Sequence, residues 1–458
     1  MSKRKTLSTM LLFILTVILA VGCGGGNQAA DPEQGSGQSQ DQGSTTTPST
    51  SNQPDTSNDT TPAAPEEPKP LEGKLVIWTF AGQVEDMAKK FMEKHPGVKV
   101  ELTVFPGDQY QTKLMAAMQS GVEAPDIFDL ERGYIGKFID APFVADLTAM
   151  GGEELVKDYI PYVQAMGRDK NGVLRGISDH SSPGGFWYLK ESAKKWLGTD
   201  DPNEVAALVD SWEKVYELGK KVAADSGGSV HLIHNYSSMY DVEVYNMQPF
   251  VQDGKLVIDP AWEGLYGLMN KIRNEGVDAK LGFLSAGWNT ALNDGSVILH
   301  AIPAWATNNI DNKDGKAENK YAVARTPKGW YKGGTYRAVY EKSQNKELAF
   351  EFLKYIASPE WQKYNLEATG NMPANSVVFE ENMDTAKTPF TGDQKVLEPY
   401  YEMLKAVPAV APDPYNEEVF KKFKNASNDG IKNGWTYDKV LEEFIKEFTN
   451  SYPELKVE

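Results

Sequence analysis

The sequence predicts an α/β fold with a largely parallel sheet, because residues 71–146 alternate between patterns typical of strands and of helices. Residues 75–77 form a continuous apolar run, as in a strand that is covered on both faces. Apolar residues then recur at helical spacing over residues 84–92 and alternate with polar ones over residues 98–104. Ligands of such sheets bind near the carboxyl ends of the strands, so we expect the functional site there.

Turn and cap residues indicate where these elements begin and end. The first helix is expected to stop at Pro96, because proline cannot continue a helix. Asp108 is expected to cap a second helix, which Gly121 closes in the left-handed conformation that glycine tolerates. A third, short strand is predicted at residues 125–128.

Five sequence phrases, in this order and spacing, resemble the extracellular solute-binding proteins of ABC importers. The likeness is strongest to their carbohydrate-binding, maltose-binding-protein-like branch. The first two phrases are FMEKHPGVKV at residues 91–100 and SGVEAPD at residues 120–126. The others lie at residues 342–352, 358–361 and 370–373. The resemblance covers nearly everything after residue 71.

This resemblance implies a two-lobe, periplasmic-binding-protein-like α/β fold with a ligand cleft between the lobes and several interdomain crossovers. The chain after residue 71 is long enough for two domains. The first lobe is expected to comprise residues 71–180 with 340–383, and the second residues 181–339 with 384–458. The turn-rich segments 178–185 and 332–336 match the first two crossovers of the family.

The N-terminus has the pattern of a secretory signal. Lys3, Arg4 and Lys5 precede an apolar run at residues 11–21, which is too short to span a bilayer comfortably. We therefore expect residues 1–22 to be a signal peptide. The sequence LAVGC that ends at Cys23 resembles the bacterial lipobox, although alanine replaces the commoner leucine three positions before the cysteine. Since this is the only cysteine, disulfides within the chain are excluded, and we interpret Cys23 as a lipid anchor.

Residues 23–70 are predicted to be a disordered tether behind the lipidated cysteine. Residues 24–70 contain no aromatic residue and no Val, Ile, Leu or Met, so they cannot bury enough apolar surface to offset the entropy of ordering. A flexible chain of this length reaches roughly 35–40 Å. The expected location is extracytoplasmic, on a lipid anchor in the cell membrane.

Charge and aromatic content exclude some partners and favour others. The formal net charge is −17, and subtracting the three positive charges of residues 3–5 gives −20 for the chain without its signal. This charge disfavours nucleic acid and anionic lipid headgroups as partners. The 10 Trp and 21 Tyr residues supply rings on which the flat C–H faces of sugars can stack, although most of them must serve the core.

Signatures of catalysis are missing from the sequence. It contains no Gly-x-Ser-x-Gly elbow, no phosphate-binding loop and no His-Glu-x-x-His motif. His231 and His234 would share a face only on a helix, and their surroundings resemble a strand. Residues 311–315 resemble a calcium loop only faintly and are better interpreted as a solvated turn. We therefore expect neither enzymatic activity nor a metal or cofactor.

Candidate ligand-binding residues lie just past the predicted strand ends and in the crossovers. Trp305 follows an apolar strand after a glycine, as the family's stacking tryptophan does, and the alternative is a place in the core. Asp129 and Glu131 follow the third strand, where the family places polar contacts, and otherwise belong to a solvated loop. The remaining candidates, each of which could instead pack in the core or the hinge, are Phe80, His180, Trp187, Tyr236 and Tyr336.

These observations predict a substrate-binding receptor of an ABC transporter. It would capture a sugar or oligosaccharide outside the cell and deliver it to the permease subunits in the membrane, and we expect it to be a monomer. Two alternatives stay open. An extracellular glycan-active enzyme would need an acid/base pair across the cleft. The other is a receptor of the same fold for a non-sugar ligand such as a peptide or a polyamine, and a polyamine site would need several carboxylates that converge near Asp129 and Glu131.

Overall fold

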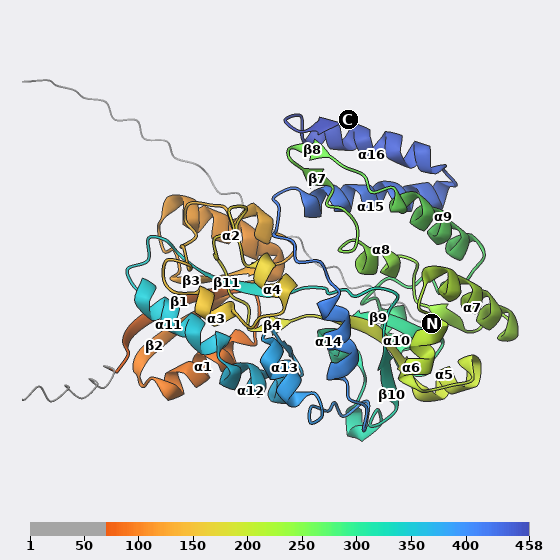
Figure 1. The fold of residues 1–458 in the computed structure, drawn as a ribbon, viewed down its shortest axis with the longest axis horizontal. Helices are drawn as coiled ribbons and strands as arrows, with labels where there is room; N and C mark the ends of the chain where they lie inside the picture. Colours follow the sequence, from red (N-terminus) through yellow and green to blue (C-terminus); the bar gives the residue numbers. More distant parts are fainter. Residues whose placement is uncertain (1–69, 458) are drawn as a thin grey trace, which may run out of the picture. The chain divides into compact units, whose positions relative to one another are not determined.

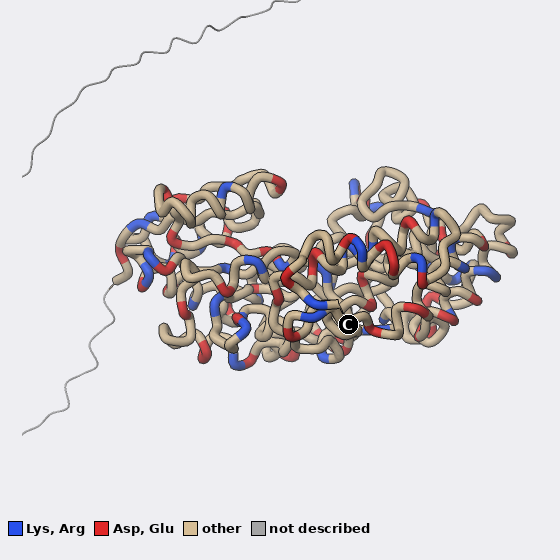
Figure 2. The backbone as a smooth tube through the Cα atoms, turned by 90° about the horizontal axis from the view of Figure 1, so that it is seen from above, with Lys and Arg blue, Asp and Glu red and all other residues tan. Residues whose placement is uncertain are grey.

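A computed structural model describes residues 70–457 of the chain (Figure 1). The expected signal peptide, Cys23 and the tether lie outside the described residues. Within the described part, no helix is long and apolar enough to cross a membrane. Basic and acidic residues are interspersed along this part of the chain rather than gathered on one element (Figure 2).

The first lobe is built on a four-stranded sheet in the order β11-β3-β1-β2. Its strands are β1 (Glu72–Thr79), β2 (Gly97–Val104), β3 (Ile127–Glu131) and β11 (Thr335–Val339). β1 pairs in parallel with both β2 and β3, whereas β11 runs antiparallel to β3. The predicted α/β fold with a largely parallel sheet is therefore confirmed, with one antiparallel strand at the edge.

Two helices connect the first three strands. α1 (Val84–Lys94) buries its apolar stripe against the sheet and against α11 (Lys346–Ala357), where the rings of Phe91 and Phe352 lie 5.0 Å apart. α2 (Gly107–Ser120) ends at Gly121, whose φ of 68° is the left-handed conformation expected there. The cap at its start differs from the prediction. Pro106 holds the cap position, so Asp108 lies in the first turn instead of capping the helix.

The second lobe contains a sheet in the order β10-β5-β9-β6. Its strands are β5 (Gly184–Leu189), β6 (His231–Ile233), β9 (Val297–Pro303) and β10 (Tyr321–Ala324). β9 pairs antiparallel with β5 and parallel with β6, and all its residues are buried. The helices of this lobe include α7 (Trp212–Asp225), α9 (Ala261–Asn274) and α10 (Ala286–Asp294). The Ser211 side chain caps α7 by accepting a hydrogen bond from the Lys214 N–H.

The remaining elements complete the two lobes. They are η1 (Ile135–Lys137), α3 (Glu153–Val156), α4 (Pro161–Met166), β4 (His180–Ser181), α5 (Lys190–Leu197), α6 (Pro202–Leu208), α8 (Ser238–Glu243), β7 (Val251–Gln252), β8 (Lys255–Leu256), η2 (Ala304–Asn309), η3 (Lys313–Gly315), α12 (Pro359–Thr369), β12 (Met372–Pro373), α13 (Ser376–Asn382), α14 (Leu397–Lys405), α15 (Asn416–Asn433), α16 (Tyr437–Ser451) and β13 (Lys456–Val457).

Three stretches of chain pass between the lobes. The first contains β4, the second leads from Tyr331 into β11, and the third contains β12, which pairs with β4. Because β11 pairs with β3, the chain re-enters the first sheet at Thr335, five residues before the boundary expected at residue 340. Gly333 and Gly334 precede this point with φ values of 84° and 117°, which only glycine adopts easily.

Two buried histidines, His234 and His300, stack in the second lobe. The rings of His234 and His300 lie 5.9 Å apart and nearly parallel, and the edge of Trp288 faces them. Burial lowers the pKa of His234 to about 3 and that of His300 to about 4, from an ordinary value of 6.5. Both imidazoles are therefore neutral in the folded chain and bind a proton on unfolding below pH 6.5.

We expect the free energy of unfolding to fall as the pH drops from 6.5 towards 4. Each histidine contributes a slope of about 1.4 kcal/mol per pH unit, because the unfolded state binds the additional proton. Urea titrations of the protein at pH 7 and pH 5 measure this slope, and His300→Leu is expected to reduce it. An unfolding free energy that changes equally with pH in the wild type and in His300→Leu would contradict the assignment.

Candidate functional site

A cleft of ≈400 Å³ lies where the two lobes and their connecting strands meet. We call it the interlobe cleft. The first lobe contributes residues 80–83, which follow β1, and Glu131 at the end of β3. The second lobe contributes the start of η2, with Trp305. The crossing segments supply β4 with Ser182, residues 333–335, and the pair Asn371 and Met372. A ligand in this cleft would contact both lobes and all three crossing segments.

A larger hollow of ≈680 Å³ lies elsewhere, around Asp201, Thr391 and Gln394. Of the two four-stranded sheets, it touches only that of the second lobe, through β10, and its other lining residues come from α5, α6, α14 and the loops between elements. We assign the candidate site to the smaller interlobe cleft because it combines aromatic and polar side chains at strand ends, where α/β proteins bind their ligands.

Trp305 forms the aromatic wall on the second lobe. It lies in the first turn of η2, directly after β9 ends at Pro303. Its indole N–H donates a hydrogen bond of 2.9 Å to the Lys332 carbonyl oxygen, and the edge of Phe283 packs 6.1 Å from the ring. The indole is thus held in one orientation while it lines the cleft, which suits it for stacking on a ligand.

Phe80 lies on the first lobe in the loop that follows β1. Its ring packs edge-on against Tyr110 at 5.3 Å and is only partly buried. The Thr79 hydroxyl fixes this loop by accepting a hydrogen bond of 2.9 Å from the Ala81 N–H. Aromatic surface therefore reaches the cleft from each lobe.

Glu131 brings a carboxylate to the cleft from the last position of β3. One oxygen, Oε2, accepts a hydrogen bond of 2.7 Å from the Gly133 N–H. Burial raises the pKa of Glu131 above its usual value, while the Gly133 N–H and the charge of Arg132 act in the opposite direction. The other oxygen accepts no hydrogen bond from the described residues, and it can accept one from a ligand hydroxyl.

His180 contributes an oriented imidazole from β4. Its Nδ1 lies 3.0 Å from Oδ1 of the buried Asp179. Asp179 Oδ1 also accepts a hydrogen bond from Arg337, and Oδ2 accepts from the Trp361 indole at 2.9 Å and from the Asn365 amide at 3.1 Å. Burial opposes the charged form of Asp179, but Arg337 and His180 outweigh it and hold the pKa of Asp179 below its usual range. This carboxylate favours a proton on Nδ1 and leaves Nε2 for the cleft.

Asp129 lies beneath the cleft instead of lining it. It is fully buried within β3, accepts a hydrogen bond from the Thr79 hydroxyl, and lies 3.5 Å from Arg337 Nε. Burial raises the pKa of Asp129 although Arg337 is near, because it has fewer donors than Asp179. The strand was expected to end at residue 128, but β3 continues to Glu131 and carries Asp129 inside the sheet.

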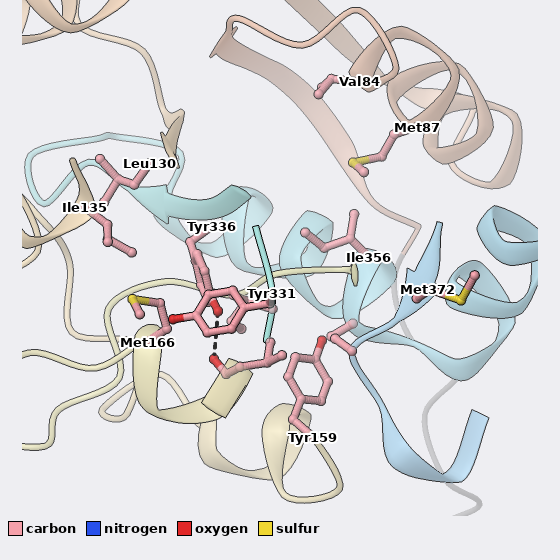
Figure 3. Packing of buried hydrophobic residues seen from close by; sticks show 14 of the residues in the cluster. Val84, Met87, Leu130, Ile135, Tyr159, Met166, Tyr331, Tyr336, Ile356 and Met372 are labelled. Atoms are coloured by element: carbon pink, nitrogen blue, oxygen red, sulfur yellow. Dashed lines mark hydrogen bonds between the residues drawn. The ribbon is translucent and has the colours of Figure 1, made fainter. Parts of the chain in front are cut away.

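Three other candidates also lie in the core, because their polar atoms find partners within the fold. The Trp187 indole donates to the Tyr400 hydroxyl at 2.6 Å. The Tyr236 hydroxyl donates to Asn428 at 2.9 Å. The Tyr336 hydroxyl donates to the Val163 carbonyl oxygen at 3.1 Å (Figure 3). Of the eight candidates, the structure brings Phe80, Glu131, His180 and Trp305 together, and their role in binding a ligand stays a prediction.

Sequence reasoning missed eight side chains that line the cleft. They are Ala81, Gln83, Ser181, Ser182, Ala304, Thr335, Asn371 and Met372. A signal for the last two was present, because they lie within the family-like phrase at residues 370–373. The pairing of β12 with β4, which brings this phrase to the cleft, joins residues about 190 positions apart and has no local pattern in the sequence.

Stacked rings, which we call the tyrosine column, join the lobes beside the cleft. Tyr162 of the first lobe stacks on Tyr331 of the second crossing at 4.2 Å, and Tyr331 stacks on Tyr245 of the second lobe at 4.3 Å. The Arg132 guanidinium lies 4.4 Å from the Tyr245 ring and forms an ion pair with Glu417.

Among the described residues, no group of three or more His, Cys, Asp or Glu could hold a metal ion.

We expect Arg337→Met to lower the free energy of unfolding by about 3–5 kcal/mol, because Asp179 would stay buried without its charged partner. Lys214→Met is the matched control, since it removes an exposed ion pair with Asp210 and should change stability little. Chemical denaturation measures both variants. Equal effects of the two substitutions would show that the buried pair does not support the fold.

Two lobes around a cleft with aromatic walls are the architecture that the resemblance to solute-binding proteins predicted. A family model described as bacterial extracellular solute-binding protein matches residues 86–391. The match spans more than half of the chain, and the protein belongs to this family.

Similar proteins share this architecture. A curated relative, the arabinooligosaccharide-binding protein of Halalkalibacterium halodurans, is 25% identical over 401 residues, which are 79% of this chain and 86% of the relative. A crystal structure of an extracellular solute-binding protein of family 1 superposes with a TM-score of 0.73 at 20% identity, over 81% of this chain and 99% of the other. The ABC-transporter-associated binding protein of B. animalis subsp. lactis, solved with beta-1,6-galactobiose, gives 0.66 at 20% identity, over 85% and 100%.

Proposed function

We propose that this protein is the receptor of an ABC importer that binds a sugar or oligosaccharide outside the cell and presents it to the permease. The observation that carries the proposal is the interlobe cleft, where Trp305 and Phe80 face polar groups that include Glu131 and His180. Rings can stack on the C–H faces of a sugar while carboxylate, imidazole and amide groups bind its hydroxyls. The arabinooligosaccharide-binding relative supports this class of ligand.

Ligand binding would act through the two lobes. A sugar that touches Trp305 on one lobe and Glu131 on the other stabilises conformations in which both contacts form. The population therefore shifts towards the closed conformer, and the permease distinguishes it from the open one. The crossing segments are the hinge of this movement.

The geometry favours binding over catalysis. Among the described residues that line the cleft, Glu131 is the only carboxylate. A glycosidase uses two carboxyl groups about 5–9.5 Å apart. Asp129, the other acidic candidate, is buried beside Arg337 and does not line the cleft. The same arrangement argues against a polyamine receptor, which needs several carboxylates around its cations.

We also propose that the receptor is a monomer held at the cell membrane by a lipid on Cys23, after removal of residues 1–22 and with residues 23–70 as its tether. The support is the lipobox-like sequence ahead of Cys23 and the extracellular family to which the chain belongs. A tethered receptor stays within reach of its permease.

Cys23→Ser is expected to move the receptor from the membrane fraction to the medium of cells that express it. The thioether to diacylglycerol cannot form on serine, so the anchor is lost. Fractionation and immunoblotting of the two strains measure the shift. A receptor that stays in the membrane fraction after this substitution would contradict the anchor.

Trp305→Ala is expected to weaken sugar binding about five- to thirtyfold, because an aromatic contact of roughly 1–2 kcal/mol is lost. Isothermal titration with arabino-oligosaccharides and beta-1,6-galactobiose measures the affinity. Trp196→Ala is the matched control, since Trp196 lies on α5 and does not line the cleft. If no carbohydrate binds the wild type while peptides do, the sugar assignment is wrong.

A further inference from the structure

In the described part of the chain, the interlobe cleft is lined by one acidic residue and by no lysine or arginine, although several cations lie close to it. Of its described lining residues, Glu131 is the only acidic one, and neither lysine nor arginine is among them. His180 is the other titratable group, and its Nδ1 is directed at the carboxylate of Asp179. A ligand in this cleft therefore meets one carboxylate and no permanently cationic side chain.

Three cations lie within two residues of the lining in sequence, and each is paired outside the cleft. Arg132, next to Glu131, lies over Tyr245 and pairs with Glu417. Lys332, next to the lining glycine at residue 333, has its Nζ 2.7 Å from Asp241.

Arg337, two residues after Thr335, is fully buried between the carboxylates of Asp129 and Asp179. None of the three guanidinium or ammonium groups can form a direct ion pair with an anion in the cleft without leaving its partner. Breaking such partly or fully buried pairs is costly, so these cations are not available to a ligand.

The free oxygen of Glu131 then distinguishes ligands by charge. A neutral sugar can donate a hydroxyl hydrogen to it, which gives a charge-assisted hydrogen bond. A carboxylate or phosphate has no hydrogen to donate and meets a like charge in a partly desolvated place, where repulsion is stronger than in water.

We propose that the interlobe cleft selects neutral sugars over acidic ones, such as uronic acids and sugar phosphates, and that Glu131 is the residue that rejects the anions. This inference rests on the proposed function and names the ligand class of the same site. Glu131 is thus a specificity-determining residue, while Arg132, Lys332 and Arg337 support it by being paired elsewhere.

Matched ligands test the selection. Isothermal titration at about pH 8 and low ionic strength compares arabino-oligosaccharides and beta-1,6-galactobiose with the same sugars after oxidation of a primary hydroxyl to a carboxylate. The wild type is expected to bind the acidic form at least about tenfold more weakly than its neutral parent. Glu131→Gln should bring the ratio of the two dissociation constants, acidic form over neutral parent, close to one. The amide keeps a hydrogen-bonding oxygen without the charge.

Two further variants separate a local effect from the charge of the whole protein. Gln83→Glu adds a second carboxylate at an exposed position of the cleft and should increase the ratio. Glu154→Gln removes an exposed carboxylate that does not line the cleft and should leave the ratio at its wild-type value.

The outcomes distinguish this inference from the proposed function. Equal binding of neutral and acidic sugars by the wild type, or an unchanged ratio in Glu131→Gln, would overturn only the selection by charge and would leave the sugar receptor standing. Tighter binding of spermidine than of any neutral sugar would overturn it as well. Binding of neither sugar form would overturn the sugar receptor and this inference with it.

Discussion

The buried guanidinium of Arg337 holds together the parts of the chain on which the site depends. It lies in β11 between Asp129 of β3 and Asp179, which directly precedes β4. Trp361 and Asn365 of α12 donate to the same Asp179 carboxylate. One ionic cluster therefore fixes two crossing segments, an edge of the first sheet and a helix of the first lobe. A buried ion pair adds little net stability, but its geometry is specific and it is costly to break.

The positions of the ligand-facing groups follow from this cluster. Asp179 orients His180, and the pairing of β11 with β3 sets Glu131 opposite Thr335 at the rim of the cleft. On the second lobe, Trp305 is fixed through the carbonyl oxygen of Lys332, which belongs to the same crossing as β11. The groups that are expected to bind a sugar are thus attached to hinge segments. Small movements of the lobes would change their spacing, which links ligand contact to closure.

Local patterns in the sequence predicted the alternating strands and helices of the first lobe, whereas the two-lobe architecture was implied by the resemblance to the family, and the site was predicted only in part. Helical spacing and strand alternation placed α1 and β2, and Gly121 ended α2 where its left-handed conformation is required. The side chains of Asp129 and Glu131 share one face of β3, yet only Glu131 lies at the strand end that opens into the cleft. Trp187 and Trp305 differ in the same way, since Trp187 lies within β5 and Trp305 lies beyond β9. Such differences depend on strand length and on partners such as Tyr400, which are far away in the sequence.

The most direct measurement is a crystal structure of the protein grown with a neutral oligosaccharide that raises its melting temperature. We expect electron density for a sugar ring over the indole of Trp305, with hydroxyls within hydrogen-bonding distance of Glu131 and His180. Contacts from both lobes to one ligand would establish the interlobe cleft as the binding site. Density for the sugar in the hollow around Asp201, Thr391 and Gln394, with the interlobe cleft free of ligand, would contradict it.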